Sequence, residues 1–249
     1  MKSISIIIPC YNAEKFIEKN IRFLIKIIKK EKLSYQLILI DDGSTDNTKE
    51  IIKRLINKSI KKIFLPKNFG KSFAIKLALK STKHKDIILI DCDLPYINKL
   101  RLVIKKLKNG YDFVAIDRRH RESSLKDEKL NIYQIFRYLV GMIISKIVYI
   151  FLPVKLNTYD TQAGLKGIRA FKNFKNFEFI SKKFFLDLEL FYLFIKYKKK
   201  FYFIPTNYKI NKKSSIKFFS INSFKIIYEL ILVIINIRFN KYRYSNSKK

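Results

Sequence analysis

Residues Ser3–Lys30 read SISIIIPCYNAEKFIEKNIRFLIKIIKK and contain the unit from which the fold class can be predicted. The first part, Ser3–Pro9, is a nearly continuous aliphatic run, as expected for a strand that is covered on both faces of a sheet. The second part, Glu14–Lys30, places isoleucines and a leucine three and four residues apart, which predicts a helix with one apolar face. A strand followed directly by a helix is the repeating unit of an α/β protein.

The same alternation continues to about residue 120. Further strand-like runs are QLILID (Gln36–Asp41), KKIFLP (Lys61–Pro66), DIILID (Asp86–Asp91) and DFVAID (Asp112–Asp117). Strands that alternate with helices predict a mostly parallel, Rossmann-like sheet flanked by helices and joined by right-handed crossovers. Ligands of such sheets bind beyond the carboxyl ends of the strands, so the residues that follow each run belong together.

Four carboxylates follow two of these runs. Asp41 and Asp42 follow the second strand, and Asp91 and Asp93 follow the fourth. Like charges gathered at one sheet edge would repel one another unless a metal ion or hydrogen-bond donors held them. Oxygen ligands are typical of Mg²⁺ or Mn²⁺, so the pattern predicts a divalent cation that neutralises a diphosphate. The alternative for each acid is an ordinary turn residue.

Composition indicates the partners of this domain. The 249 residues include 53 Lys and Arg against 20 Asp and Glu, with 48% hydrophobic residues, so a core can lie beneath a strongly cationic surface. Such a surface favours polyanionic partners, although a general compositional bias toward lysine would produce the same excess. Nucleic acid is disfavoured, because the strand-end carboxylates would repel its phosphates. Two cysteines and no secretory pattern predict a reduced, cytoplasmic setting.

Two apolar segments lie in the second half of the chain, at Ile132–Val154 and Ile226–Ile237. Arg137 and Lys146 interrupt the first segment, and neither segment supplies the ~18 uncharged apolar residues of a membrane span. Both segments could lie along an anionic membrane surface with their cations at the lipid headgroups. They could equally be ordinary core helices or helices that contact a partner.

A series of sequence blocks in a fixed order carries a family resemblance. The blocks are IIIPCYNAEKFI, LILIDDGSTDNT, KNFGKSFAIKLAL, ILIDCDLPY, YDTQAGLKGIRA and FFLDLELFYLFIKYKKKFYFIPTNYKINKKSSIK. In these blocks the chain resembles the family-two glycosyltransferases of the GT-A fold. The DTQAGLKG and LDLEL blocks make it similar, more narrowly, to dolichyl- or polyprenyl-phosphate sugar synthases. The resemblance implies a GT-A domain over residues 1–215, with interfacial helices at 130–154, and a C-terminal amphipathic helix with a basic tail at 216–249.

The resemblance implies a donor site at the strand ends. Asp91 and Asp93 match the family's acid-x-acid motif, in which the second acid binds the metal ion and the first lies near the ribose or the donor sugar. Both are therefore expected at the metal, whereas Asp41 is expected to be structural. The residues expected to bind the nucleotide-sugar are Pro9, Tyr11, Asn12, Glu14, Asp42, Lys71 and Asp91.

The later blocks are expected to bind the acceptor phosphate. Arg118 follows the fifth strand and suits bidentate phosphate binding, although Arg119 could take its place. Gln162 is a further candidate in the YDTQAG block. Arg137 is a weaker one, because a cation on an interfacial helix is an equal explanation for it.

The remaining catalytic group is expected on a helix. Asp187 matches an acid of the family, and Glu189 lies two positions on, about 200° around the helix, so only one of the two can face the site. Glu189 is expected to be structural. The full set of expected catalytic residues is Asp91, Asp93, Arg118 and Asp187.

The acceptor decides which groups the reaction needs. A polyprenyl phosphate is already ionised and needs only positioning, whereas a saccharide hydroxyl needs a base, for which Asp187 is the candidate. The basic surface favours the first case. The sequence thus predicts inverting transfer of a hexose from a nucleotide-diphosphate sugar to a polyprenyl phosphate, peripherally on the cytoplasmic face of the membrane.

Two alternatives stay open at this point. One is a glycosyltransferase that acts on a saccharide hydroxyl in the assembly of cell-surface polysaccharide. The other is a catalytically inactive interaction protein with a transferase fold. Two departures from the family pattern suggest it, namely Ala13 where an acid is frequent and Pro95 where glutamine is common. Proline supplies no side-chain ligand, so a metal ion would need another oxygen or more water.

Overall fold

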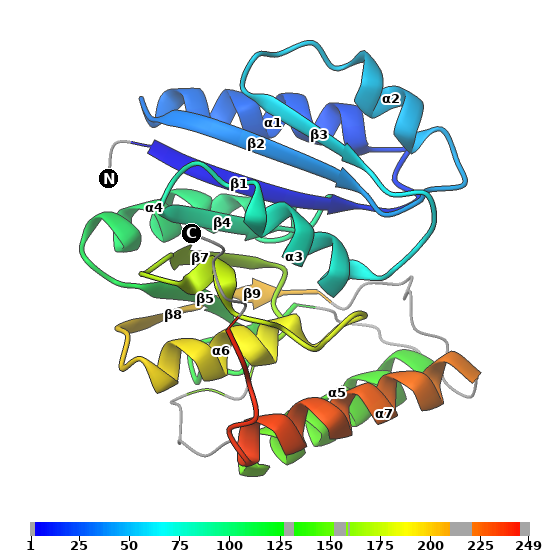
Figure 1. Cartoon of the computed structure of the whole chain (residues 1–249), viewed down its shortest axis with the longest axis vertical. Coiled ribbons are helices and arrows are strands. Elements are labelled where there is room, and N and C mark those ends of the chain that lie inside the picture. Colours follow the sequence, from blue (N-terminus) through cyan, green and yellow to red (C-terminus); the bar gives the residue numbers. More distant parts are fainter. Residues whose placement is uncertain (1–2, 127–131, 152–157, 159, 210–220, 245–249) are drawn as a thin grey trace.

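The computed structural model describes residues 3–126, 132–151, 158, 160–209 and 221–244. Its centre is a sheet of seven strands in the order β3-β2-β1-β4-β7-β5-β8 (Figure 1). These strands are β1 (Ser3–Cys10), β2 (Ser34–Asp41), β3 (Ile60–Phe64), β4 (Asp86–Ile90), β5 (Phe113–Asp117), β7 (Leu165–Arg169) and β8 (Phe201–Pro205). β7 runs antiparallel to its neighbours β4 and β5, and the other neighbouring strands run parallel. The predicted α/β class with a mostly parallel sheet is confirmed.

Helices cover both faces of the sheet. One hydrophobic cluster lies between the sheet and α1 (Ile17–Lys30), α2 (Thr48–Arg54) and α4 (Leu100–Lys108). A second cluster lies on the opposite face, beneath α3 (Lys71–Lys80), α6 (Leu186–Lys196) and α7 (Ile221–Arg238). α5 (Ile132–Phe151), two short 3₁₀ turns at Ile97–Lys99 and Phe174–Asn176, and the paired strands β6 (Ser124–Leu125) and β9 (Asn207–Tyr208) complete the fold.

The first helix begins three residues later than its apolar pattern predicts. α1 starts at Ile17, because the carbonyl of Ala13 accepts hydrogen bonds from the backbone of Phe16 and Ile17 in a tight turn. The N–H of Ala13 donates to the Thr48 side chain at 2.7 Å, which holds the residues after β1 on the neighbouring loop. A local turn and one tertiary hydrogen bond thus replace the first turn of the predicted helix and shape the loop that precedes α1.

The helices α5 and α7 lie side by side at one end of the molecule (Figure 1). α7 buries Val233 and Ile237 in the same cluster as α6, so it packs on the α/β domain. Because residues 210–220 lie outside the described part, the expected boundary after residue 215 stays a prediction. None of the helices that the structure describes has the length and apolar character needed to cross a bilayer.

Apolar side chains on the outer sides of α5 and α7 are exposed. On α5 they include Ile135, Phe136, Leu139 and Ile143, and on α7 they include Ile227, Tyr228, Ile231 and Ile235. We call these eight residues the outer apolar face. A cluster of large exposed apolar side chains is typical of a surface that contacts a partner or a membrane.

Candidate active site

The carboxyl ends of β1, β2 and β4 lie at one edge of the sheet because the three strands run parallel. Ile7 of β1 pairs with Leu89 of β4, so Pro9 and Asp91, each two residues further on, reach the same level. The register of β1 and β2 brings Asp41 to this edge as well. The fold therefore gathers the strand-end residues as the sequence predicts.

Asp91 forms an ion pair with the first residue of α3. Its Oδ1 lies 2.5 Å from Nζ of Lys71, and about a third of each side chain is exposed, 32% for Asp91 and 34% for Lys71. Burial disfavours the charge of Lys71, but the carboxylates of Asp91 and Asp187 outweigh this effect and raise the pKa of the ammonium. Asp91 and Lys71, both expected at the nucleotide-sugar, are thus a charged pair that solvent still reaches.

The glycine before β7 determines how closely the chain approaches Asp91. The N–H of Asp91 donates to the carbonyl of Gly164 at 3.0 Å. A Cβ on Gly164 would lie 2.6 Å from Oδ2 of Asp91 and 2.8 Å from Cγ of Pro95. Any side chain at this position would therefore displace the strand-end carboxylate or the proline.

Asp93 is exposed in the turn that follows β4. Leu94 and Tyr96, on either side of Pro95, have φ values of 52° and 57°, in the left-handed region that residues with a side chain rarely adopt. Leu94 is nevertheless buried in the core beneath α1 and α4. Packing of this leucine compensates for the backbone strain and keeps the turn in a form that leaves Asp93 accessible.

Asp41 and Asp42 are held by hydrogen-bond donors, which the sequence left open as the alternative to a metal ion. In the described part of the chain, no group of three or more His, Cys, Asp or Glu side chains is arranged to hold a metal ion. Asp41 accepts a 2.5 Å hydrogen bond from the Ser44 hydroxyl. Asp42 accepts backbone hydrogen bonds from Phe69 at 2.8 Å and Gly70 at 2.9 Å. Donors from Ser44, Phe69 and Gly70 thus hold these two acids.

Asp42 fastens the loop between β3 and α3 to the end of β2. Both carboxylate oxygens are engaged by that loop, and the residue is 3% exposed. Burial raises the pKa of Asp42, and the two backbone N–H donors offset only part of this effect. Its contact with the nucleotide stays a prediction, because the structure assigns the carboxylate to the loop that carries Lys71.

The loop after β1 is tied to the loop after β2. Oδ1 of Asn12 accepts a hydrogen bond from the N–H of Thr45, and Oε2 of Glu14 accepts one from the N–H of Asn47, both at 2.9 Å. Tyr11 directly precedes Asn12 in sequence and is 46% exposed. Asn12 and Glu14 thus shape the expected nucleotide loop, and Tyr11 presents a ring to solvent there.

Asp187 and Lys166 form a buried ion pair next to Lys71. Oδ1 of Asp187, in the first turn of α6, lies 3.2 Å from Nζ of Lys166, whose side chain is 3% exposed. The Lys166 ammonium also donates to the carbonyl of Ala163. Burial lowers the pKa of Lys166, and Asp187 offsets only part of this effect. Asp187 does face the site, whereas Glu189 is fully buried elsewhere.

Arg118 and its neighbour Arg119 have different surroundings. The Arg118 guanidinium binds both oxygens of Asp160, at 2.8 and 2.7 Å, in a bidentate pair. Burial opposes the charge of Asp160, but Arg118 outweighs it and lowers the pKa of that carboxyl. Nε and Nη1 of Arg119 are buried and have no hydrogen-bond partner among the described residues, and the guanidinium lies over the Tyr138 ring of α5 at 4.8 Å. Of these two arginines, Arg119 is therefore the one whose guanidinium can still donate hydrogen bonds to a ligand.

The other expected acceptor residues are only partly described. Gln162 is exposed, and its backbone N–H donates to Asp160 at 3.3 Å. Arg137 belongs to α5, but its side chain lies outside the described part. Both assignments therefore stay predictions.

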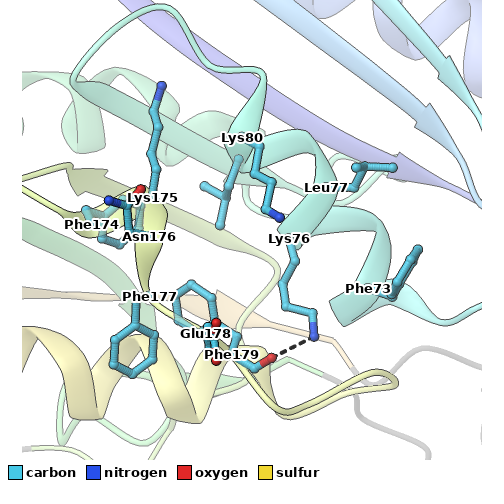
Figure 2. Close-up of a pocket in the computed structure, with 11 residues that line it drawn as sticks. Phe73, Lys76, Leu77, Lys80, Phe174, Lys175, Asn176, Phe177, Glu178 and Phe179 are labelled. Atoms are coloured by element: carbon cyan, nitrogen blue, oxygen red, sulfur yellow. Dashed lines mark hydrogen bonds between the residues drawn. The ribbon is translucent and has the colours of Figure 1, made fainter. Parts of the chain in front are cut away.

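Cavity volume alone does not identify this site. The strand-end groups that include Pro9, Lys71 and Asp187 enclose only about 10 Å³. A hollow of about 310 Å³ lies elsewhere, between α3 and residues 174–179, where Lys76 donates to the carbonyl of Phe179 at 2.9 Å (Figure 2). None of the residues that line this second hollow is an expected site residue. A substrate of the strand-end site would therefore bind over the sheet edge rather than in a closed cavity.

Comparison with known proteins assigns the family. Residues 5–177 match the family model described as Glycosyl transferase family 2. The chain belongs to this family. The glycosyltransferase resemblance of the sequence blocks is thereby confirmed for the greater part of the chain.

Relatives of this family-2 glycosyltransferase include proteins that are named for lipid phosphates. The chain is 33% identical over 141 residues to an uncharacterized glycosyltransferase, YkcC, of Bacillus subtilis, which covers 55% of this chain and 44% of YkcC. It is 30% identical over 128 residues to the undecaprenyl-phosphate 4-deoxy-4-formamido-L-arabinose transferase of Proteus mirabilis, which covers 50% of this chain and 39% of that enzyme. The matched region thus spans less than half the length of these relatives.

Solved structures share the fold of this family-2 glycosyltransferase at low sequence identity. Glucosyl-3-phosphoglycerate synthase from Mycobacterium tuberculosis, solved with Mn²⁺, uridine diphosphate and phosphoglyceric acid, has a TM-score of 0.66 and 15% identity, and covers 95% of this chain and 78% of that one. The same synthase was also solved with Mg²⁺ and uridine diphosphate, at a TM-score of 0.64. At this low sequence identity, the structural similarity establishes the GT-A fold of the chain and nothing about its substrates.

Two features of the site were not predicted as functional from the sequence. One is Lys166, which is buried between Leu165 and Gly167 in β7, a strand that also contains Ile168 and ends at Arg169. A lysine inside a buried strand is a usable signal, because lysines are almost never fully buried unless they are paired. The other is the pairing of Arg118 with Asp160, and no local pattern could reveal this contact because 42 residues separate the partners.

Proposed function

We propose that this family-2 glycosyltransferase transfers a hexose, with inversion, from a nucleotide-diphosphate sugar to a polyprenyl phosphate at the cytoplasmic face of a membrane. The observation that carries the acceptor assignment is Arg119. Two buried nitrogens of its guanidinium have no hydrogen-bond partner among the described residues, which is unfavourable unless an acceptor enters, and a phosphate oxygen suits the planar fork of donors. The names of the undecaprenyl-phosphate relatives support the same acceptor class.

Asp91 and Asp93 fit a divalent cation of the kind that the acid-x-acid motif implies. Mg²⁺ usually takes one or two protein carboxylates and completes its shell with substrate phosphates and water. Two acids at an accessible strand end, with Pro95 adding no ligand, suit that donor set for Mg²⁺ or Mn²⁺. The ion would stabilise the negative charge of the leaving diphosphate. Lys71, paired with Asp91 at 2.5 Å, adds a second positive charge at the same place.

The surroundings of Asp187 favour a phosphate acceptor over a saccharide hydroxyl. A hydroxyl acceptor needs a base that can receive its proton. The Asp187 carboxylate is 8% exposed and already engaged by Lys166, so we assign it to orienting Lys166 and Lys71. An ionised phosphate acceptor needs only to be held in line with the sugar.

The acceptor assignment is tested by transfer assays with a short-chain polyprenyl phosphate, Mn²⁺ and a panel of nucleotide-sugars. We expect transfer only when the lipid phosphate is present. We expect Arg119→Met to raise the KM for the lipid phosphate roughly tenfold to a hundredfold, because a charge-assisted phosphate contact is lost. Arg121→Met, which removes an arginine side chain that is 89% exposed, should leave this KM unchanged. Transfer to a saccharide instead, or an unchanged KM in the Arg119 variant, would refute the assignment.

The membrane location is proposed from the outer apolar face of α5 and α7. Apolar side chains that are half exposed gain free energy by entering the headgroup region, and the formal net charge of +33 adds attraction to anionic lipid. Lys146 on α5 and Lys225 on α7 are exposed cations on the same two helices. These features support a peripheral location.

Vesicle sedimentation distinguishes apolar docking from simple charge attraction. We expect Ile143→Ser combined with Ile231→Ser to weaken binding to anionic vesicles roughly tenfold or more, at ~25 cal/mol per Å² of apolar surface lost. Ile147 of α5 is not used as a substitution site, because its side chain lies outside the described part. The control is Ile56→Ser, because Ile56 is 99% exposed and far from these helices in sequence. Equal binding by all three proteins would show that charge alone acts.

A further inference from the structure

The segment Ser181–Phe185 connects three parts of the molecule. It leads into α6, its carbonyls reach the start of α3, and its amides reach α7. The Ser72 N–H donates to the Lys183 carbonyl at 3.0 Å, and the Phe73 N–H donates to the Lys182 carbonyl at 2.9 Å. The first N–H groups of a helix have no partner within the helix, and no side chain caps α3. The segment therefore supplies the N-terminal cap of α3.

Glu229 of α7 holds this segment from the opposite side. Its Oε1 accepts the backbone N–H of Lys183 at 3.0 Å and the Ser181 hydroxyl at 2.5 Å. The N–H of Phe184 approaches the same oxygen at 3.3 Å. Hydrogen bonds to a carboxylate are stronger than those between neutral groups. One charged side chain thus fixes the stretch of backbone that caps α3.

The same hydrogen bonds join the starts of α3 and α6. Oγ of Ser72 lies 3.0 Å from Oγ of Ser181 and accepts the N–H of Leu186 at 3.2 Å. Lys71 precedes Ser72, and Asp187 follows Leu186. The two charged groups next to the strand-end acids are therefore each one residue away from this hydrogen-bonded junction.

The contact between the segment and the start of α3 is close. Gly70 has φ of 108°, and a Cβ there would lie 2.5 Å from the Lys182 carbonyl oxygen. Two backbones that touch in this way move together, because no side chain lies between them to absorb a shift. A displacement of the segment would thus be passed to Lys71.

We propose that Glu229 is a positioning residue for the donor site. By fixing Ser181–Phe185 it sets the placement of Lys71 and Asp187 relative to the strand-end acids, so the alignment of the site depends on the seating of α7. The inference rests on the proposed function for the reaction that is affected, but the mechanical link itself does not depend on the substrate.

Amide hydrogen exchange on the full chain tests the link without any substrate. We expect Glu229→Gln to speed exchange of the Ser72 and Phe73 amides by about tenfold or more, because their acceptors lose a charged anchor. Glu178→Gln removes the same charge from an exposed residue and should leave both amides unchanged. Ser181→Ala, which deletes the hydroxyl contact to Glu229, should shift the same amides in the same direction and serves if Glu229→Gln does not fold.

Transfer kinetics test the consequence for the site. At a temperature where all variants are folded, we expect Glu229→Gln to lower kcat about tenfold or more with the nucleotide Kd within about twofold of the parent. A lower kcat with an unchanged nucleotide Kd would indicate a positioning role. A merely structural role would lower the unfolding temperature and leave kcat unchanged. Among the described residues, the hydrogen bonds of Glu229 go to Ser181, Lys183 and Phe184 and not to the loops after β1 and β2, so these loops should still bind the nucleotide.

The outcomes of the two arms are distinguishable. Unchanged exchange at Ser72 and Phe73 would overturn the link, and faster exchange with an unchanged kcat would overturn the positioning role. If the parent chain transfers no sugar to any acceptor, the proposed function fails, whereas the exchange arm still decides the link.

Discussion

Asp93→Ala is expected to abolish metal-dependent binding of the donor and to lower turnover roughly a hundredfold to a thousandfold. Asp93 is exposed at the end of a turn and belongs to neither hydrophobic cluster, so its loss removes a ligand without opening the core. Calorimetry with a nucleotide-sugar, with and without Mn²⁺, measures the binding, and thermal unfolding verifies that the fold is retained.

The control for this variant is another exposed acid on a different loop. Glu122→Ala removes a carboxylate whose side chain is 62% exposed, and it should leave both donor affinity and turnover at the level of the parent. If Asp93→Ala still bound the donor with the same Mn²⁺ dependence, the acid-x-acid motif would not be the metal site of this chain.

Asp187→Ala is expected to lower the free energy of unfolding by about 3–5 kcal/mol and to abolish turnover. The reason is Lys166, whose ammonium would stay buried with a backbone carbonyl as its remaining partner. Removal of one member of a buried ion pair leaves an uncompensated charge, which destabilises more than the pair itself stabilises. Chemical denaturation measures the loss.

A double variant separates stability from function at this pair. Asp187→Leu with Lys166→Met replaces the ion pair by apolar side chains of similar size, so most of the lost stability should return. Turnover should stay low, because Lys71 then lacks the neighbouring Asp187 carboxylate that helps to orient it. Recovery of turnover along with stability would show that the pair is needed only for folding.

The fold was predictable where the signal is local. Burial on both faces gives β1 and β4 their continuous aliphatic runs, and burial on one face gives α1 its spacing of Ile17, Ile21, Leu24 and Ile28. The insertion of β7, antiparallel, between β4 and β5 was not predicted. Strand order depends on contacts between segments far apart in sequence, and periodicity contains no information about them.

The candidate site likewise has features that a local sequence pattern predicts and features that depend on long-range contacts. The placement of Asp91 and Asp93 at a strand end could be predicted from the sequence, because an aliphatic run followed by acids is a local pattern. Three other features depend on tertiary contacts: Asp42 holds a loop, Arg118 binds Asp160, and Lys166 pairs with Asp187. Tertiary contacts also leave two buried nitrogens of Arg119 without a hydrogen-bond partner among the described residues. The physical reason is that the state of a charged group depends on which groups lie within a few ångströms of it. Chain folding sets those distances, and it brings together residues that are tens of positions apart in the sequence.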